Sequence, residues 1–235
     1  MSVTNKRNPI LNTYKLNNEA LTCENMIKYL GVTIDNKLTF GQHIQEKCKN
    51  ATTILNILRR NLYFAPRTVK SKAYKSCVLP ILEYASSCWS PSSQKLSNTL
   101  EMVQHNAAKF IANTYNKKGD FKQFSISKIL RNLNLDTLEE RRTQAKLIMA
   151  YKIINEHVIL DPITLPKSNS QRPLRQCNVP KVGFENQLSE PEPGLQVVNN
   201  TFFYSVPKLW NDNVTPIQAN APSVEAFKGH FNKNH

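Results

Sequence analysis

Glycine is scarce in this chain, with 6 residues among 235. A glycine-rich phosphate-binding loop is therefore hard to build, and the chain contains no G-x-S-x-G or H-E-x-x-H motif. The aspartates are isolated from one another, so no adjacent pair predicts a site for the two metal ions of nucleotidyl transfer. From its residues alone, the chain is predicted to have no catalytic residue, no metal ligand and no cofactor.

Cysteines are few and widely spaced. The chain has five of them, Cys23, Cys48, Cys77, Cys88 and Cys177. They form no C-x-x-C pair, and none has a histidine at zinc-ligand spacing. Their odd number also argues against a disulfide framework. We expect small buried thiols in a reduced compartment, with Cys77 and Cys88 in the core rather than acting as nucleophiles.

Long apolar runs are absent as well. No segment approaches the roughly 18 apolar residues that span a bilayer, and the N-terminal residues lack the apolar stretch of a secretory signal. We therefore expect an intracellular protein, in the nucleus or the cytoplasm, without a membrane partner. The apolar share of 40% is enough for a hydrophobic core.

Positive charge is what the chain has in excess, since 31 Lys and Arg against 17 Asp and Glu give a net charge of +14. Residues 40–118 carry 12 basic and 3 acidic side chains, whereas residues 158–235 carry 7 and 6. An excess of this size indicates a polyanionic partner, which is nucleic acid or an anionic surface. A basic surface on the helices of residues 40–118 would contact phosphates without regard to base sequence.

Hydrophobic periodicity divides the chain into four segments and predicts a mainly α fold. Residues 1–39 predict a β-hairpin, with alternating runs at 10–16 and 29–34 and turn signals at Asn17 and Asn18. Residues 40–157 predict a helical bundle. Residues 158–200 are rich in proline and predict an extended segment. Residues 201–235 predict an aromatic segment, docked as a strand, and a short helix capped by Ser223.

Local signals give finer expectations for the helical segment. The third long helix should begin at the serine pair that ends with Ser93. Pro80 should kink or end the second helix, and residues 81–89 predict a further helical run. Asp136 followed by Glu139 predicts a capping box. The buried face of the second helix is predicted to consist of Val69, Ala73 and Cys77.

Six sequence blocks follow one another in a fixed order between about residues 5 and 231. They read KYLGVTIDNKLTF, ILRRNL, KSKAYKSCVLPILEYASSCWSP, LEMVQHNAAKFI, LEERRTQAKLIMAYKI and FFYSVPKLWN, the last followed by SVEAFK. Together they resemble the C-terminal third of reverse transcriptases from non-LTR (LINE-type, jockey-like) retrotransposons. The chain departs from the family pattern at Phe40, where many relatives have Trp, and at Asn213 and Val214, where they often have Leu-Pro.

The resemblance implies that the YLGV segment closes the palm subdomain beside the primer terminus and that the thumb helices follow at once. The residues then expected to bind nucleic acid are Tyr29, Gly31, Lys47, Lys49, Arg59 and Arg60. The family's catalytic aspartates, which use Mg²⁺, lie upstream of these blocks. We therefore expect a fragment without polymerase activity, whose partners are RNA–DNA or DNA duplex and, in the full-length element, the palm and fingers domains.

Three interpretations of function stay open at this point. The chain could be a non-catalytic remnant that holds template–primer duplex, a domesticated helical adaptor that binds nucleic acid or protein, or a non-functional element remnant that does not fold without the palm. A duplex-holding module should prefer hybrid or A-form duplex to single strands, whereas an adaptor need not. The genomic DNA upstream of Met1 would discriminate, because codons for an aromatic-x-Asp-Asp motif there indicate an element copy and an unrelated exon favours domestication.

Overall fold

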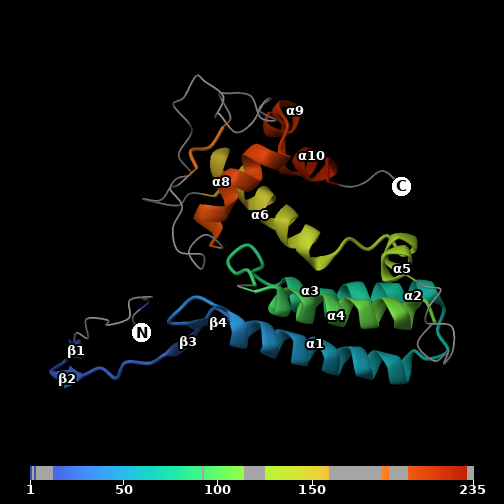
Figure 1. The fold of residues 1–235 in the computed structure, drawn as a ribbon, viewed down its shortest axis with the longest axis horizontal. Coiled ribbons are helices and arrows are strands. Elements are labelled where there is room, and N and C mark those ends of the chain that lie inside the picture. Colours follow the sequence, from blue (N-terminus) through green and yellow to red (C-terminus); the bar gives the residue numbers. More distant parts are fainter. Residues whose placement is uncertain are drawn as a thin grey trace. The chain divides into compact units, whose positions relative to one another are not determined.

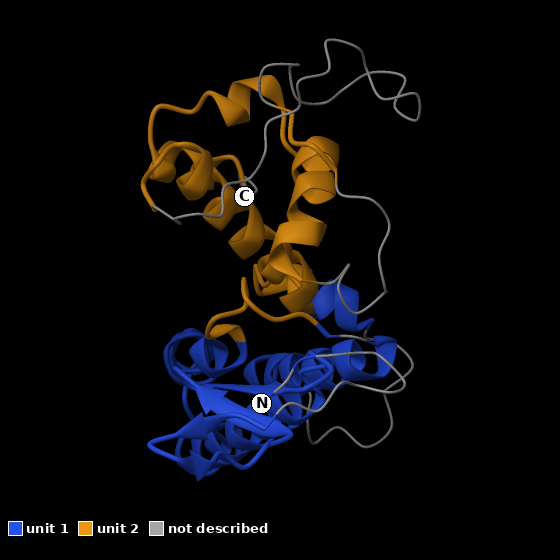
Figure 2. Cartoon of the chain, turned by 90° about the vertical axis from the view of Figure 1, so that its left-hand side faces the viewer, with its two compact units in different colours: residues 1–82, 91–129 blue, residues 83–90, 130–235 orange. Residues whose placement is uncertain are grey.

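The computed structural model describes residues 1, 3, 13–91, 93–113, 125–158, 187–190 and 201–231. Their fold is mainly α with short strands near the N-terminus, as predicted (Figure 1). The chain divides into two compact units (Figure 2). Unit 1 comprises Met1–Leu82 and Pro91–Ile129, and unit 2 comprises Glu83–Ser90 and Leu130–His235. The boundary after Ile129 falls inside the range 40–157, which the sequence pattern treats as one bundle.

Two short antiparallel hairpins precede the helices of unit 1. The first pairs β1 (Lys15–Leu16) with β2 (Glu19–Ala20), and the second pairs β3 (Met26–Tyr29) with β4 (Val32–Asp35). The first hairpin turns at the predicted residues, Asn17 and Asn18, which both have positive φ. Part of the predicted run at residues 10–16 lies outside the described residues.

The second hairpin corrects the prediction of one continuous strand over residues 29–34. Leu30 and Gly31 have φ values of 44° and 79° and form a two-residue turn between β3 and β4. Two successive residues with positive φ match the twist of antiparallel strands, and glycine adopts this conformation without steric cost. Gly31 therefore reverses the chain rather than interrupting a strand.

Two long helices, α1 (Gly41–Asn61) and α4 (Gln94–Ile111), pack against each other in unit 1 (Figure 1). Their buried residues include Ile44, Ala51 and Leu55 of α1, and Leu100, Ala107 and Ile111 of α4. The start of α4 is confirmed, because the hydroxyl of Ser93 accepts a hydrogen bond from the backbone N–H of Leu96. Both helices therefore form where the apolar stripes predict them.

Residues 67–83 form one run of consecutive helical segments: α2 (Arg67–Ala73), the π-helical turn η1 (Tyr74–Val78) and α3 (Leu79–Glu83). Pro80 does not end the helix, and the irregular turn directly before it is a π-helix, a type often found as a single-turn bulge. The helical prediction for residues 81–89 is wrong beyond Glu83, where the chain enters turns that lead to the buried Trp89.

The buried face of this helical run differs from the prediction. Lys70, Tyr74 and Val78 are buried, whereas Val69 and Cys77 are exposed. The predicted series (69, 73, 77) and the observed series (70, 74, 78) each have the four-residue spacing of one helical face, so hydrophobic periodicity could not show which of the two is buried. The prediction chose the series without a charge, but the ammonium group of Lys70 has two oxygen acceptors, the Tyr63 carbonyl and the Asn113 side chain.

The next helices are α5 (Ile126–Asn132) and α6 (Leu138–Ile154). A capping box opens α6, but it lies one residue later than predicted. Thr137 Oγ1 accepts a hydrogen bond from the N–H of Glu140 at 3.1 Å, and the Glu140 carboxylate accepts one from the N–H of Thr137 at 3.0 Å. Threonine followed three residues later by glutamate has the usual pattern of this cap, and it satisfies two otherwise unpaired donors.

Three helices complete the described part of unit 2: α8 (Phe202–Asn213), α9 (Pro216–Ala219) and α10 (Val224–Gly229). The prediction of a docked strand over residues 201–210 is wrong. Val206 and Trp210 lie four residues apart and bury one stripe of α8, and α8 packs against α6 despite the internal Pro207. The cap at Ser223 is confirmed, since its hydroxyl accepts from the N–H of Ala226 at 3.1 Å.

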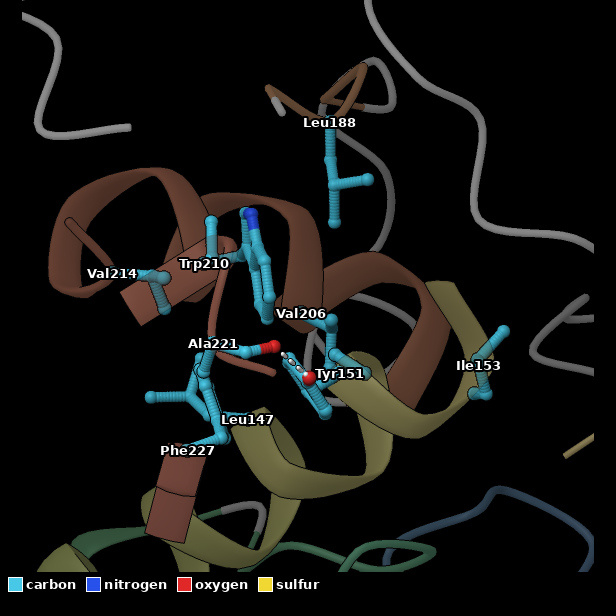
Figure 3. Packing of buried hydrophobic residues seen from close by; sticks show 11 residues of the cluster. Leu147, Tyr151, Ile153, Leu188, Val206, Trp210, Val214, Ala221 and Phe227 are labelled. Atoms are coloured by element: carbon cyan, nitrogen blue, oxygen red, sulfur yellow. Dashed lines mark hydrogen bonds between the residues drawn. The ribbon is translucent and has the colours of Figure 1, made fainter. Parts of the chain in front are cut away.

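An aromatic stack forms the centre of the unit 2 core (Figure 3). The ring of Phe227 lies 4.4 Å from that of Tyr151 and 5.8 Å from that of Trp210, with 17° between the planes in each pair. The hydroxyl of Tyr151 donates a hydrogen bond to the carbonyl of Ala221 at 2.5 Å. The core therefore connects α6, α8 and α10 and satisfies its buried polar group.

Most of residues 158–200, predicted to be extended, lies outside the described residues. The described residues 187–190 contact α8 through Asn211. The Asn211 side chain accepts from the N–H of Leu188 and donates to its carbonyl, each at 3.0 Å. Leu188 itself is buried in the unit 2 core.

Candidate nucleic-acid interface

The charge of the chain is divided unequally between the two units. Unit 1 contains 19 Lys and Arg against 6 Asp and Glu, a net charge of +13, whereas unit 2 contains 12 against 11, a net charge of +1. The densest part is residues 47–82, which contain eight basic side chains and no Asp or Glu. These residues make up most of α1, all of α2 and η1, and most of α3. A candidate surface for a polyanion therefore lies on unit 1.

The solvent face of α1 carries two of the predicted phosphate contacts. Lys49 and Arg60 are exposed and lie eleven residues apart, which is close to three full turns, so they share one face. That face lies opposite the buried residues Ile44, Ala51 and Leu55. The two Cα atoms are about 16 Å apart along the helix axis. The structure therefore presents these two cations to solvent on the same side of α1.

The other two predicted contacts, Lys47 and Arg59, lie on the flanks of α1 and are only partly exposed. The guanidinium of Arg59 donates to the backbone carbonyl of Asn106 on α4 at 3.1 Å and to the side chain of Asn56 at 3.2 Å. Arg59 thus helps to join α1 to α4. The structure does not bring the four basic residues onto one face.

Tyr29 and Gly31 lie at the tip of the second hairpin. Tyr29 is 63% exposed at the end of β3, and Gly31 is the second residue of the turn. The hairpin is joined to α1 through the buried His43, whose Nδ1 accepts from the N–H of Thr33 at 3.2 Å. Burial lowers the pKa of His43, and the nearby Lys47 lowers it further, which favours the neutral imidazole that this hydrogen bond requires.

Asp35 fixes the connection from β4 into α1. Its carboxylate accepts hydrogen bonds from the N–H groups of Lys37, Thr39 and Phe40 at 2.8 to 3.1 Å and from the Thr39 hydroxyl at 3.0 Å. Burial raises the pKa of Asp35, but these hydrogen bonds outweigh it and hold the pKa below its usual value. The hairpin therefore has a defined attachment to the first turn of α1.

Sequence reasoning missed the loop between α1 and α2 and the lysine that holds it. Lys70 is 2% exposed, and its Nζ donates to the carbonyl of Tyr63 at 2.9 Å and to Asn113 Oδ1 at 2.5 Å. Burial lowers the pKa of Lys70, and Arg67 adds to this effect. Tyr63 and Phe64 are exposed on the loop. The only signal in the sequence was that Lys70 shares a helical stripe with Tyr74 and Val78.

Two cations of unit 2 are buried and do not contribute to a surface. Arg142 and Lys146 lie one turn apart on α6, and Lys146 Nζ donates to the hydroxyl of Ser205 at 3.0 Å. Burial lowers the pKa of Lys146 to about 8, with a further contribution from Arg142.

Cysteine placement corrects another expectation. Of the four described cysteines, Cys48 is buried, whereas Cys23, Cys77 and Cys88 are exposed. Cys177 lies outside the described residues.

Among the described residues, no three His, Cys, Asp or Glu side chains are close enough to hold a metal ion. No described helix is long and apolar enough to cross a membrane.

Comparison with known proteins gives one informative match. The chain is 27% identical over 187 residues to a Drosophila melanogaster protein named "Probable RNA-directed DNA polymerase from transposon BS". The match covers 78% of this chain and 19% of the relative, so the chain spans about a fifth of that protein's length. No protein-family model matches the chain, and no solved structure matches it. The similarity to transposon reverse transcriptases that the sequence blocks predict is therefore confirmed.

Proposed function

We propose that this chain is the nucleic-acid-holding part of a protein related to transposon reverse transcriptases. In this proposal, the helices of unit 1 hold template–primer duplex, and the chain alone does not polymerise. The observation that carries the proposal is the net charge of +13 on unit 1, with no acidic residue between positions 47 and 82. The similarity to an RNA-directed DNA polymerase over 78% of the chain supports the same class of partner. The catalytic aspartates and their Mg²⁺ would belong to other parts of such a polymerase.

Lys49 and Arg60 are the proposed phosphate contacts, because they are exposed and share one face of α1. Lys47 lies about 160° around α1 from Lys49, so it is not proposed as a phosphate contact on this face and would only add to the local positive potential. Arg59 is proposed to position α1 against α4 through its bond to Asn106. In the same arrangement Tyr29 and Gly31, at the hairpin tip, would lie at the edge of the surface that faces nucleic acid.

The salt dependence of binding tests this assignment. Each phosphate contact that is lost should reduce the slope of log K against log salt by about 0.9 for duplex DNA. The double variant Lys49→Ala/Arg60→Ala should therefore flatten the slope by about 2 and lower the affinity mainly at low salt. Fluorescence anisotropy with labelled RNA–DNA hybrid, DNA duplex and single-stranded RNA measures the affinities. A duplex-holding module should prefer the hybrid to single-stranded RNA.

A matched control removes one lysine and one arginine from unit 2 instead. Arg131 and Lys208 are both exposed there, so Arg131→Ala/Lys208→Ala should keep the parent slope. If both double variants change the slope equally, binding reflects net charge rather than a surface on α1. If neither differs from the parent chain, Lys49 and Arg60 make no phosphate contact.

Primer extension on an RNA template tests the absence of polymerase activity. With Mg²⁺ or Mn²⁺ supplied, we expect no incorporation above background, because no carboxylate pair suited to two metal ions is evident in the sequence. Incorporation by this chain alone would contradict the proposal.

A further inference from the structure

The loop that connects α1 to α2, residues 62–66, presents two aromatic rings to solvent. Phe64 is 96% exposed and Tyr63 is 54% exposed. Their ring centroids lie 4.8 Å apart with the planes at 89°, so the two rings support each other edge to face. We call Tyr63 and Phe64 the aromatic tip. Because Phe64 is almost wholly exposed, its ring is accessible to solvent and to a stacking partner.

The aromatic tip is held by the protein behind it. The buried ammonium of Lys70 donates to the carbonyl of Tyr63 and to the side chain of Asn113. The N–H of Ala65 also donates to the carbonyl of Leu62 at 3.1 Å. A loop fixed in this way loses little conformational entropy when a ligand binds.

Charge next to the tip favours a polyanion. Arg60 precedes the tip on the last turn of α1, and Arg67 follows it at the start of α2. Both are exposed, and Arg67 is oriented by a hydrogen bond to the carbonyl of Ala112 at 3.3 Å. Because residues 47–82 contain no Asp or Glu, nothing in this segment offsets their charge. An exposed ring between cations is how proteins bind an unpaired base together with its phosphates.

We propose that the aromatic tip stacks on the first unpaired base beside a duplex, while Arg60 and Arg67 contact the flanking phosphates. The inference rests on the proposed function, because it places a single-strand site next to the duplex that unit 1 holds. Stacking is tolerant of base identity, so the site should accept any base.

The test compares a blunt RNA–DNA hybrid with the same hybrid carrying a single-stranded overhang. We expect the parent chain to bind the overhang substrate more tightly than the blunt one. Phe64→Ala should weaken binding of the overhang substrate between about 5- and 100-fold and leave blunt binding unchanged. Phe64→Trp should keep the preference. Ile217→Ala is the matched control, because Ile217 is 78% exposed on α9 in unit 2.

A second readout follows stacking directly. With 2-aminopurine as the first unpaired base, binding of the parent chain should quench its fluorescence, whereas binding of Phe64→Ala should not. Unchanged overhang affinity and unchanged quenching in Phe64→Ala would overturn the inference and leave the salt-slope test of the proposed function standing. Tight binding of the parent chain to anionic phospholipid vesicles, lost in Phe64→Ala while the overhang preference persists, would assign the tip to a lipid surface instead. If the parent chain binds neither substrate, both proposals fail.

Discussion

The buried Lys146 should make the stability of unit 2 depend on pH in the alkaline range. Only 6% of this residue is exposed, and its ammonium group lies 3.0 Å from the hydroxyl of Ser205 on α8. Its pKa in the folded chain is about 8, compared with 10.5 for an ordinary lysine. The lowered pKa means that the folded state disfavours the charged form, because burial removes the hydration of the ammonium and Arg142 repels it.

The sign and size of the effect follow from proton linkage. Between pH 8 and pH 10.5 the unfolded chain holds a proton on Lys146 that the folded chain has released, so the free energy of unfolding increases as pH rises. Below pH 8 both states are protonated and this residue contributes no pH dependence. With 1.36 kcal/mol per pKa unit, Lys146 should raise the free energy of unfolding by about 2 kcal/mol between pH 7 and pH 9.5.

Urea denaturation followed by tryptophan fluorescence measures this change in unit 2 alone, because both tryptophans, Trp89 and Trp210, belong to that unit. As pH rises from 7 to 9.5, the free energy of unfolding of the parent chain should increase by about 2 kcal/mol relative to that of Lys146→Met. Lys208→Met, which changes an exposed lysine of α8, should run parallel to the parent chain. If Lys146→Met also runs parallel to the parent over this range, the ammonium is not desolvated and the reasoning is wrong.

Three further substitutions test the local structure. Thr137→Ala removes the capping oxygen for the N–H of Glu140 and should lower the free energy of unfolding by about 1 kcal/mol in the tryptophan assay, whereas Thr137→Ser should restore it. Tyr151→Phe leaves the buried carbonyl of Ala221 without its donor and should cost about 1 kcal/mol in the same assay, and an unchanged midpoint would show that this hydrogen bond contributes nothing. The pKa of Asp35 is lowered in the folded chain, so the stabilisation that its carboxylate provides is present above pH 3.8 and is lost as pH falls through the folded pKa. Asp35→Asn should therefore remove this contribution to the acid unfolding of unit 1, followed by far-ultraviolet circular dichroism. An acid transition that is the same in Asp35→Asn and the parent chain would contradict this prediction.

The sequence by itself determined the features that depend on neighbouring residues. Apolar stripes located α1, α4 and α6, and serine caps located the starts of α4 and α10, because helix periodicity and capping are properties of a few consecutive residues. The turn at Asn17 and Asn18 was found for the same reason. The order of the six blocks also indicated the relation to transposon reverse transcriptases, because that signal lies in the residues themselves.

Tertiary structure decided the features for which local signals conflict or are silent. Residues 201–210 were predicted to dock as a strand, but all except the first belong to helix α8, because a helix buries Val206 and Trp210 together against α6. The buried face of residues 67–83 contains Lys70, because acceptors distant in sequence satisfy its ammonium group. Another long-range contact separates the predicted phosphate-binding residues. Arg59 is hydrogen-bonded to α4, whereas Lys49 and Arg60 share the solvent face of α1. Burial and hydrogen bonding across the fold depend on residues far apart in the chain, and no local pattern records them.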